Sequence, residues 1–317
     1  MILITGAGGY IGRRLVRRLR AQGHTLRCLA TPQHARYVLD DPAIERFALA
    51  EPDDRQWSEL VAGIHTIIHL RSAMWWGGAA DQSAVEIEGT KKLISAARNA
   101  QVGRIVLISH LNAATASGIE TLRIKSMQED LLRNSGIAHT IIRSSLVFGE
   151  GDSFISHLAA NLYLNPLFLL TPSRGEFLQQ PLYVNDLVEA ILRSLNSIDL
   201  LDTTVSVGGP ELLSFQELLQ TIARVLSIKR TMLPIPPFLL RGMNRVWRRF
   251  VPRSLITDQW FDLVFTSRTT DPIHFARTFA LQPQRLEDTL QQYLPRQNHF
   301  GFWLRRVFRR APRRNRS

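Results

Sequence analysis

Three glycines near the start of the 317-residue chain have the spacing of a phosphate-binding loop. The segment Gly6-x-x-Gly9-x-x-Gly12 follows the apolar residues 1–4 and precedes a helical pattern over 13–22. Glycines permit a sharp turn and let backbone N–H groups approach a pyrophosphate, and the partly positive start of the next helix attracts the anion. A strand before and a helix after give the motif the context that it needs. We therefore predict dinucleotide binding; a merely structural turn is the alternative.

The first turn of this helix adds further candidate cofactor contacts. The helix is expected to begin near Tyr10, which places Tyr10 and Ile11 at the positive end of its dipole. Arg13 follows close to the loop and adds a basic side chain. We expect these three residues to bind the cofactor together with the glycines.

The segment around the second predicted strand, 24–30, bears on the choice between NAD and NADP. An acidic residue at the end of this strand would bind the ribose hydroxyls of NAD. Residues 24–37 contain no Asp or Glu and carry Arg27, His34 and Arg36 instead. This composition favours a 2′-phosphate and hence NADP over NAD, although the basic groups could simply be solvated.

The elements that must position this loop alternate between strands and helices. Such alternation supplies the crossovers that parallel strands need, so we predict an α/β fold with a doubly wound parallel Rossmann sheet and a smaller C-terminal substrate lobe. The cofactor domain is expected over 1–150, with return segments at about 181–208, and the interleaved lobe over 151–295. The strands are expected at 1–4, 24–30, 66–70, 104–109, 140–142, 181–184 and 204–207, and the helices at 13–22, 58–62, 84–100, 124–134, 185–195 and 214–226. Asn185 or Asp186 is expected to cap the helix at 185–195, and Ser214 with Glu217 predicts a capping box at the last helix.

Charge is distributed unevenly along the chain. Lys and Arg number 39 against 27 Asp and Glu, a net charge of +12. Residues 296–317 hold eight arginines and no acid, so this basic tail carries +8 and leaves +4 for the rest. Its aromatic and apolar residues recur at helical spacing, which suits an anionic membrane surface or an acidic protein; a disordered extension is the alternative. No base-reading motif accompanies it, so sequence-specific nucleic acid recognition is not expected.

Other features narrow the class of protein. One cysteine, Cys28, excludes an internal disulfide, and the nine histidines show no metal-ligand spacing, so we expect no metal site. The longest apolar run, 158–170, is shorter than the ~20 residues that span a bilayer, and no signal-peptide pattern is present. We expect a cytoplasmic protein, with peripheral attachment to the inner face of a membrane left open. Residues 241–253 form a second basic, aromatic helix pattern. We expect a helix of the substrate lobe with its apolar face on the body; a surface helix like the one suggested for the tail is the alternative.

Several segments together resemble the atypical and extended short-chain dehydrogenase/reductase superfamily, which is NAD-dependent epimerase/dehydratase-like. The closest likeness is to its NmrA-like and complex I accessory-subunit-like branch. The resemblance implies that Leu70, Arg71, Ser144 and Val147 line the cofactor. The segments are Thr5–Gly12, Ile67–Leu70, Gly89–Thr90, Arg104–Ser109, Ile141–Gly149 and Gln180–Asp186.

The resemblance also implies a proton relay, and this chain departs from it. Family enzymes use Tyr-x-x-x-Lys on one helix, with a Ser or Thr that polarises the substrate oxygen. Lys125 matches the lysine and Ser109 the serine, but Thr121 stands where the tyrosine is usual. A threonine hydroxyl has a far higher pKa than a phenol and is shorter by a ring. Arg71 and Glu86 also replace residues usual in the family, and could pair with each other.

The sequence thus combines an intact cofactor loop with a broken proton relay. One interpretation is a nucleotide-binding structural or sensing protein with weak or no turnover, which docks on a membrane or a complex. The other is an active NAD(P)-dependent oxidoreductase or epimerase on a small or lipid-like substrate, with a rearranged acid/base. Lys125 can hold the nicotinamide ribose in either case.

Overall fold

A seven-stranded parallel sheet forms the centre of the computed structural model, which describes residues 1–73, 81–165, 168–172, 177–250, 261–262 and 264–301. The strand order is β11-β6-β5-β4-β1-β2-β3, so the order reverses between β1 and β4. The predicted doubly wound sheet is confirmed. Its strands are β1 (Ile2–Thr5), β2 (Leu26–Ala30), β3 (Ile44–Ala48), β4 (Thr66–His69), β5 (Arg104–His110), β6 (His139–Ser144) and β11 (Thr203–Val207).

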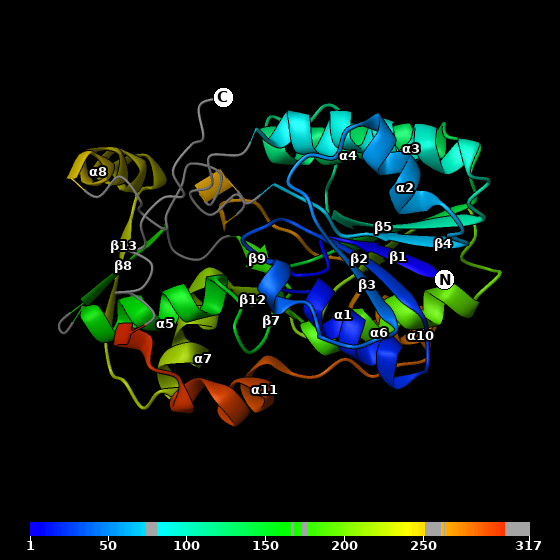
Figure 1. Cartoon of the computed structure of the whole chain (residues 1–317). Coiled ribbons are helices and arrows are strands. Elements are labelled where there is room, and N and C mark those ends of the chain that lie inside the picture. Colours follow the sequence, from blue (N-terminus) through cyan, green and yellow to red (C-terminus); the bar gives the residue numbers. More distant parts are fainter. Residues whose placement is uncertain (74–80, 166–167, 173–176, 251–260, 263, 302–317) are drawn as a thin grey trace.

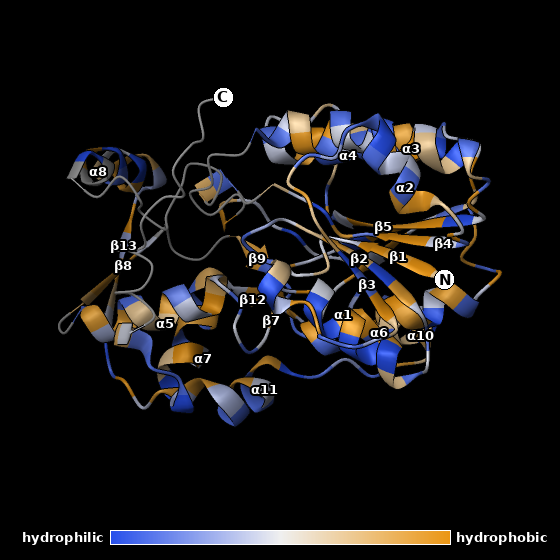
Figure 2. Ribbon diagram, in the orientation of Figure 1, coloured by the Kyte–Doolittle hydropathy of each residue, from blue (hydrophilic) through white to orange (hydrophobic). Residues whose placement is uncertain are grey.

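Helices cover both faces of the sheet (Figure 1). The apolar residues of the strands meet the apolar faces of these helices, which appear as orange bands in Figure 2. Parallel strands buried on both faces have nearly continuous apolar sequences, as the predicted strands do. One face carries α1 (Gly12–Ala21), α6 (Val184–Asn196) and α10 (Pro272–Phe279), and the other carries α2 (Asp54–Val61), α3 (Gly89–Asn99) and α4 (Glu120–Arg133). Short 3₁₀ or π turns lie at Ala35–Tyr37, Ala84–Glu88 and Leu294–Arg296.

The edge strand β3 is absent from the sequence prediction. Its residues carry Glu45 and Arg46, both exposed, and only Ile44 is fully buried. An edge strand pairs on one side alone, so its sequence lacks the apolar run that marks a central strand.

The remaining elements gather around a second hydrophobic cluster, at the other end of the molecule from β1 (Figure 1). Phe148, Phe154, Phe215 and Phe261 belong to this cluster, whereas Phe275 of α10 packs back on the sheet. The elements at this end are β7 (Val147–Phe148), α5 (Phe154–Leu164), β8 (Phe168–Pro172), β9 (Leu178–Gln179), β10 (Leu182–Tyr183), β12 (Leu213–Ser214), α7 (Phe215–Val225), β13 (Thr231–Ile235), α8 (Pro237–Phe250) and α11 (Leu286–Tyr293).

Two predicted helix starts have different outcomes. The capping box at α7 is confirmed, because the Ser214 side chain accepts from the Glu217 N–H and the Glu217 side chain accepts from the Ser214 N–H. The predicted cap of α6 by Asn185 or Asp186 is wrong. This helix begins at Val184 with no side-chain cap, and Asp186 Oδ2 accepts from the Gln284 N–H at 2.8 Å instead.

Helix α8 differs from the prediction for residues 241–253. Met243 and Val246 of the predicted apolar face are exposed, as are Phe238 and Leu239 in the preceding turn, so this part of the face does not lie on the body as expected; Leu240 packs on the second cluster. The side chains of Trp247, Phe250 and Val251 lie outside the described part of the chain. Residues 302–317 of the basic tail lie outside the described part of the chain. In the described part, no helix combines the length and apolar character that a membrane span requires.

Candidate nucleotide site and buried polar network

The glycine loop leaves little or no space for side chains at its three motif positions, and a Cβ on Gly9 would lie 3.0 Å from the Gly6 carbonyl oxygen. Gly6 has a φ of +74°, and a Cβ there would lie 3.0 Å from the carbonyl group of Leu70. A Cβ on Gly12 would lie 2.3 Å from the carbonyl oxygen of Gly6. These contacts hold the start of α1 tightly against the ends of β1 and β4, as the first and third glycines of a dinucleotide loop do.

The start of α1 has open backbone donors. Its N-cap residue, Ile11, makes no side-chain cap, and no acid lies in the first turn. The backbone N–H groups of Tyr10, Ile11 and Gly12 find no acceptor within the described ranges. By contrast, Asp53 caps α2 with its side chain. A diphosphate at α1 would satisfy these donors and meet the positive end of the dipole, so the residues present fit a dinucleotide.

The other predicted cofactor residues lie at the carboxyl edge of the same sheet. Leu70 and Arg71 directly follow β4, and the Arg71 N–H donates to Thr5 Oγ1 at 3.3 Å. Ser144 ends β6 with its hydroxyl on the Ser109 carbonyl at 3.2 Å, and Val147 lies three residues further on. Open α/β sheets bind ligands outside this edge where the strand order reverses. The fold thus brings Gly6, Leu70 and Arg71 together, with Ser109 and Ser144 two and three strands along from β1.

The side chains of Tyr10 and Arg13 point to a different place from the glycine loop. The Tyr10 hydroxyl lies next to Gly149, 2.8 Å from where a Cβ would stand on that glycine. A guanidinium nitrogen of Arg13 lies next to Gly151, 2.7 Å from the equivalent position. Burial raises the pKa of Tyr10 far above its ordinary value. These two side chains therefore join α1 to the 149–151 loop. Tyr10 can contribute to an anion site only through its backbone N–H.

One of the three basic residues that favoured NADP is already engaged. The Arg27 guanidinium forms an ion pair with Glu45 at 2.5 Å and donates to the carbonyl oxygens of Glu59, Leu60 and Ala62. The use of Arg27 as a 2′-phosphate ligand is therefore wrong. Arg36 lies against the ring of Tyr37, 4.8 Å from its centroid.

A buried ion pair occupies the place where the resemblance puts the proton relay. Lys125 Nζ lies 2.8 Å from Glu86 Oε2, and the two side chains are 3% and 0% exposed. Glu86 Oε1 also accepts from Ser72 Oγ at 2.6 Å. The proposed pair between Arg71 and Glu86 is wrong, because Arg71 donates to the Ala50 carbonyl. Thr121 is buried one helical turn before Lys125, and its hydroxyl donates to Gln82 at 3.2 Å.

Hydrogen bonds continue from Lys125 to the end of β1. Lys125 Nζ donates to Gln128 at 3.1 Å, and the Gln128 amide donates to Thr90 at 2.9 Å. Thr90 Oγ1 and Thr5 Oγ1 lie 3.3 Å and 2.8 Å from the two ring nitrogens of His69. Burial, with the nearby Lys125 and Arg71, lowers the pKa of His69 to about 3. The imidazole is therefore neutral, and the network links the relay position to the nucleotide loop.

Ser109 belongs to a separate group of charges. Its hydroxyl donates to Glu129 at 2.6 Å. Glu129 is fully buried and also binds the guanidinium groups of Arg143 and Arg133 at 2.6 and 2.7 Å. The structure therefore places Lys125 and Thr121 in one network and Ser109 in another.

Sequence reasoning missed most partners in these networks. Gln128 and Glu129 are absent from the predicted site, although Thr121, Lys125 and Gln128 recur at i, i+4 and i+7. This polar stripe on an otherwise apolar helix face was the available signal. Asp152 was also missed; burial raises the pKa of this carboxyl group to about 7.

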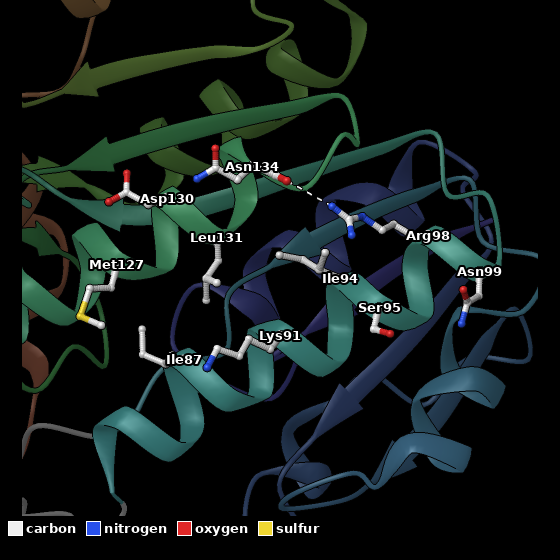
Figure 3. Close-up of a pocket in the computed structure, with 10 residues that line it drawn as sticks. All are labelled: Ile87, Lys91, Ile94, Ser95, Arg98, Asn99, Met127, Asp130, Leu131 and Asn134. Atoms are coloured by element: carbon white, nitrogen blue, oxygen red, sulfur yellow. Dashed lines mark hydrogen bonds between the residues drawn. The ribbon is translucent and has the colours of Figure 1, made fainter.

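A hollow of about 640 Å³ between α3 and α4 lies on the outer face of this layer, apart from the carboxyl edge of the sheet (Figure 3). Ile87, Ile94, Met127 and Leu131 line its apolar part. Across the described ranges, no group of three or more His, Cys, Asp or Glu side chains is placed to hold a metal ion. Trp75 and Trp76, whose position in the sequence fits either a wall of the substrate pocket or packing on the adjoining lobe, fall outside those ranges.

The sheet and its glycine loop define a Rossmann nucleotide-binding protein. Residues 6–152 match a family model described as NAD(P)H-binding. This match, together with the relatives and the fold, fits the atypical short-chain dehydrogenase/reductase superfamily that the sequence resembles.

Two similar proteins illustrate this resemblance. A rat protein, mitochondrial NADH dehydrogenase [ubiquinone] 1 alpha subcomplex subunit 9, is 26% identical over 77% of this chain. The chain spans 66% of that relative's length. The photosystem II assembly factor Ycf39 of Guillardia theta is 24% identical over 100% of this chain and 99% of its own. Among solved structures, the NADPH-dependent quinone oxidoreductase of Escherichia coli with NADPH bound has the same fold, with a TM-score of 0.75. The alignment covers 93% of this chain and 100% of that chain, at 15% identity.

Proposed function

We propose that the protein holds NAD(P) as a structural or sensing ligand with weak or no turnover. The observation that carries this proposal is the buried ion pair between Lys125 and Glu86. In the family pattern the lysine charge lowers the pKa of a neighbouring tyrosine. Here a carboxylate at 2.8 Å neutralises that charge, and Thr121 offers no phenol to activate.

The proposed cofactor contacts come from the glycine loop and the ends of the strands. The open N–H groups at the start of α1 would bind the diphosphate. The rest of the cofactor would be lined by Leu70, Arg71, Ser144 and Val147. NAD(P) supplies hydride chemistry when bound. NADP remains the favoured form because residues 24–37, which include β2, contain no acid, although Arg27 no longer supports it.

Docking on a membrane or a larger complex is the second part of the proposal. It is supported by two similar proteins, whose names describe a subunit of a respiratory enzyme and a photosystem assembly factor. The basic composition of residues 296–317 adds a positive segment that suits an anionic surface or an acidic protein. A cytoplasmic protein attached peripherally to the inner face of a membrane would fit both features.

An active oxidoreductase or epimerase is the second candidate, and His110 is the observation that favours it. Its Nδ1 is buried at the end of β5 without a hydrogen-bond partner in the described part of the chain. An enzyme without the usual tyrosine would need another side chain to transfer the proton, and an imidazole nitrogen with no other partner could do so. However, burial and the charges of Lys125 and Arg268 lower the pKa of His110 to about 3, which makes it a weak base at neutral pH.

Titration with NADH and NADPH, followed by cofactor fluorescence, tests the shared part of both candidates. We expect binding, and no binding of either nucleotide would refute the cofactor site. Turnover is then measured with a panel of carbonyl, quinone and nucleotide-sugar substrates. Turnover that Lys125→Ala abolishes, while nucleotide binding persists, would establish the enzyme and refute the non-catalytic proposal.

A further inference from the structure

Helix α8 has an unusual outer surface for a helix of a globular protein. Phe238, Leu239, Met243 and Val246 are 71%, 47%, 52% and 63% exposed. Singly exposed apolar residues are ordinary, but a contiguous apolar patch marks an interaction site. These four side chains recur over about two helical turns and so lie on one side of the helix.

Two arginines border the apolar side chains. Arg245 and Arg249 are exposed on α8, and their positions along the helix fall next to Phe238 on its outer side. The opposite side faces the body, because Asn244 is buried and Arg241 forms an ion pair with Asp262 at 2.6 Å. The outer side thus combines apolar and cationic groups, and the inner side fastens the helix to the fold.

The chain around α8 is free of acidic residues over a long stretch. No Asp or Glu occurs between Glu217 and Asp258, a stretch that includes Arg224, Lys229, Arg230, Arg241, Arg245, Arg248, Arg249 and Arg253. Two further apolar side chains are exposed in the strand pair before α8, Phe168 of β8 at 47% and Leu233 of β13 at 41%. These two strands pair with each other, and β13 leads into α8 at the end of the molecule remote from β1 (Figure 1).

We infer that the outer face of α8 is a docking surface for an anionic lipid bilayer. This inference rests on the proposed docking function and assigns it to a folded part of the chain, separate from the 296–317 tail. A helix with an apolar face and flanking arginines lies in the plane of the interface, with its apolar side chains about 5–10 Å into the headgroup boundary. The arginines are then placed for lipid phosphates.

Vesicle sedimentation of the full chain tests this surface directly. We expect binding to vesicles of phosphatidylcholine with about 30% phosphatidylserine, and much weaker binding to phosphatidylcholine alone. Arg245→Gln and Arg249→Gln should each weaken binding roughly fivefold, the equivalent of about 1 kcal/mol per basic residue. Phe238→Ser with Val246→Ser should abolish most of the remainder. Binding by these variants equal to that of the parent would overturn the inference.

Matched controls and the tail separate the possible causes. Ile198→Ser and Ile273→Ser alter exposed apolar residues elsewhere, at 81% and 54% exposure, and should leave binding unchanged. Removal of residues 302–317 should leave the α8-dependent part of binding intact. Loss of all vesicle binding on that removal, with no effect of the α8 variants, would assign docking to the tail and refute the inference.

A site-specific probe gives an independent readout. Cys28 is buried, so Val246→Cys offers one accessible thiol in the described part of the chain for an environment-sensitive fluorophore. We expect a blue shift when anionic vesicles are added; an unchanged spectrum on vesicle-bound protein would contradict insertion of α8. NADPH titration of each variant should match the parent, so a failed docking surface is distinguishable from a failed nucleotide site.

Discussion

The buried Lys125–Glu86 pair should be costly to break from one side. At 2.8 Å and an effective dielectric constant of about 20, the attraction is of the order of 6 kcal/mol. Desolvation of the two ions offsets much of this, so the net contribution of the pair is small. Loss of one partner leaves the other charge buried and uncompensated, at a cost of about 3–5 kcal/mol.

The remaining contacts predict which single variant suffers more. After Lys125→Met, the Glu86 carboxylate keeps only hydrogen-bond donors, among them Ser72 Oγ at 2.6 Å and the Ala73 N–H at 3.2 Å. After Glu86→Gln, the amide oxygen can still accept from those donors. We therefore expect Lys125→Met to lose about 4 kcal/mol of unfolding free energy, Glu86→Gln to lose less, and the double variant to be more stable than Lys125→Met alone.

Urea unfolding at pH 7, followed by tryptophan fluorescence, measures these free energies. An exposed pair provides the matched control, since Lys91 Nζ lies at the same 2.8 Å from Glu88 with both side chains more than half exposed. Lys91→Met should cost at most about 1 kcal/mol. If Lys125→Met costs no more than Lys91→Met, or if the double variant shows the sum of its two single losses, the reasoning is refuted.

Other predictions concern the nucleotide loop and the buried titratable groups. Gly12→Ala should reduce NAD(P) affinity by at least tenfold, because its Cβ would lie 2.3 Å from a carbonyl oxygen; Gly118→Ala, where nothing lies within 4 Å, should bind like the parent in the same fluorescence titration. Burial raises the pKa of Asp152 to about 7 from an unfolded value near 3.9, so the folded state favours the protonated acid. Unfolding free energy should therefore fall by up to about 4 kcal/mol as pH rises from about 4 to 7, and Asp152→Asn should flatten this slope in urea titrations. The pKa of His69 is lowered to about 3, so the unfolded chain takes up this proton first and stability should fall as pH drops from about 6.5 towards 3. If His69→Gln leaves the acid limb of the stability profile as steep as before, this assignment is wrong.

The sequence predicted most of the sheet because its central strands contain short, nearly continuous apolar runs and lie between helices. Strands such as Ile2–Thr5 and Arg104–His110 carry this pattern in a few consecutive residues. The edge strand Ile44–Ala48 lacks this apolar run, because its pairing depends on β2 and not on its own composition. The glycine loop was predicted because its constraint is local, a matter of which residues tolerate the turn.

The polar network depended on contacts that spacing does not reveal. Glu86 and Arg71 were considered as a pair because both depart from the family pattern, yet Lys125 reaches Glu86 from a helix that starts 34 residues later in the chain. The outer face of α8 was assigned to the interior because amphipathic helices usually bury their apolar side. The same periodicity fits a helix that turns this side outward, and only the tertiary structure distinguishes the two.

The path of the chain between the cluster on the α1, α6 and α10 face of the sheet and the second cluster has a mechanical consequence. The backbone passes from one cluster to the other after β6, before α6, after β11, before α10 and again after α10. So many covalent crossings leave the two halves little freedom to separate or to twist independently. A membrane that binds α8 would therefore also fix the orientation of the carboxyl edge of the sheet, where the nucleotide is proposed to bind. For the same reason, the two halves should unfold together in one transition.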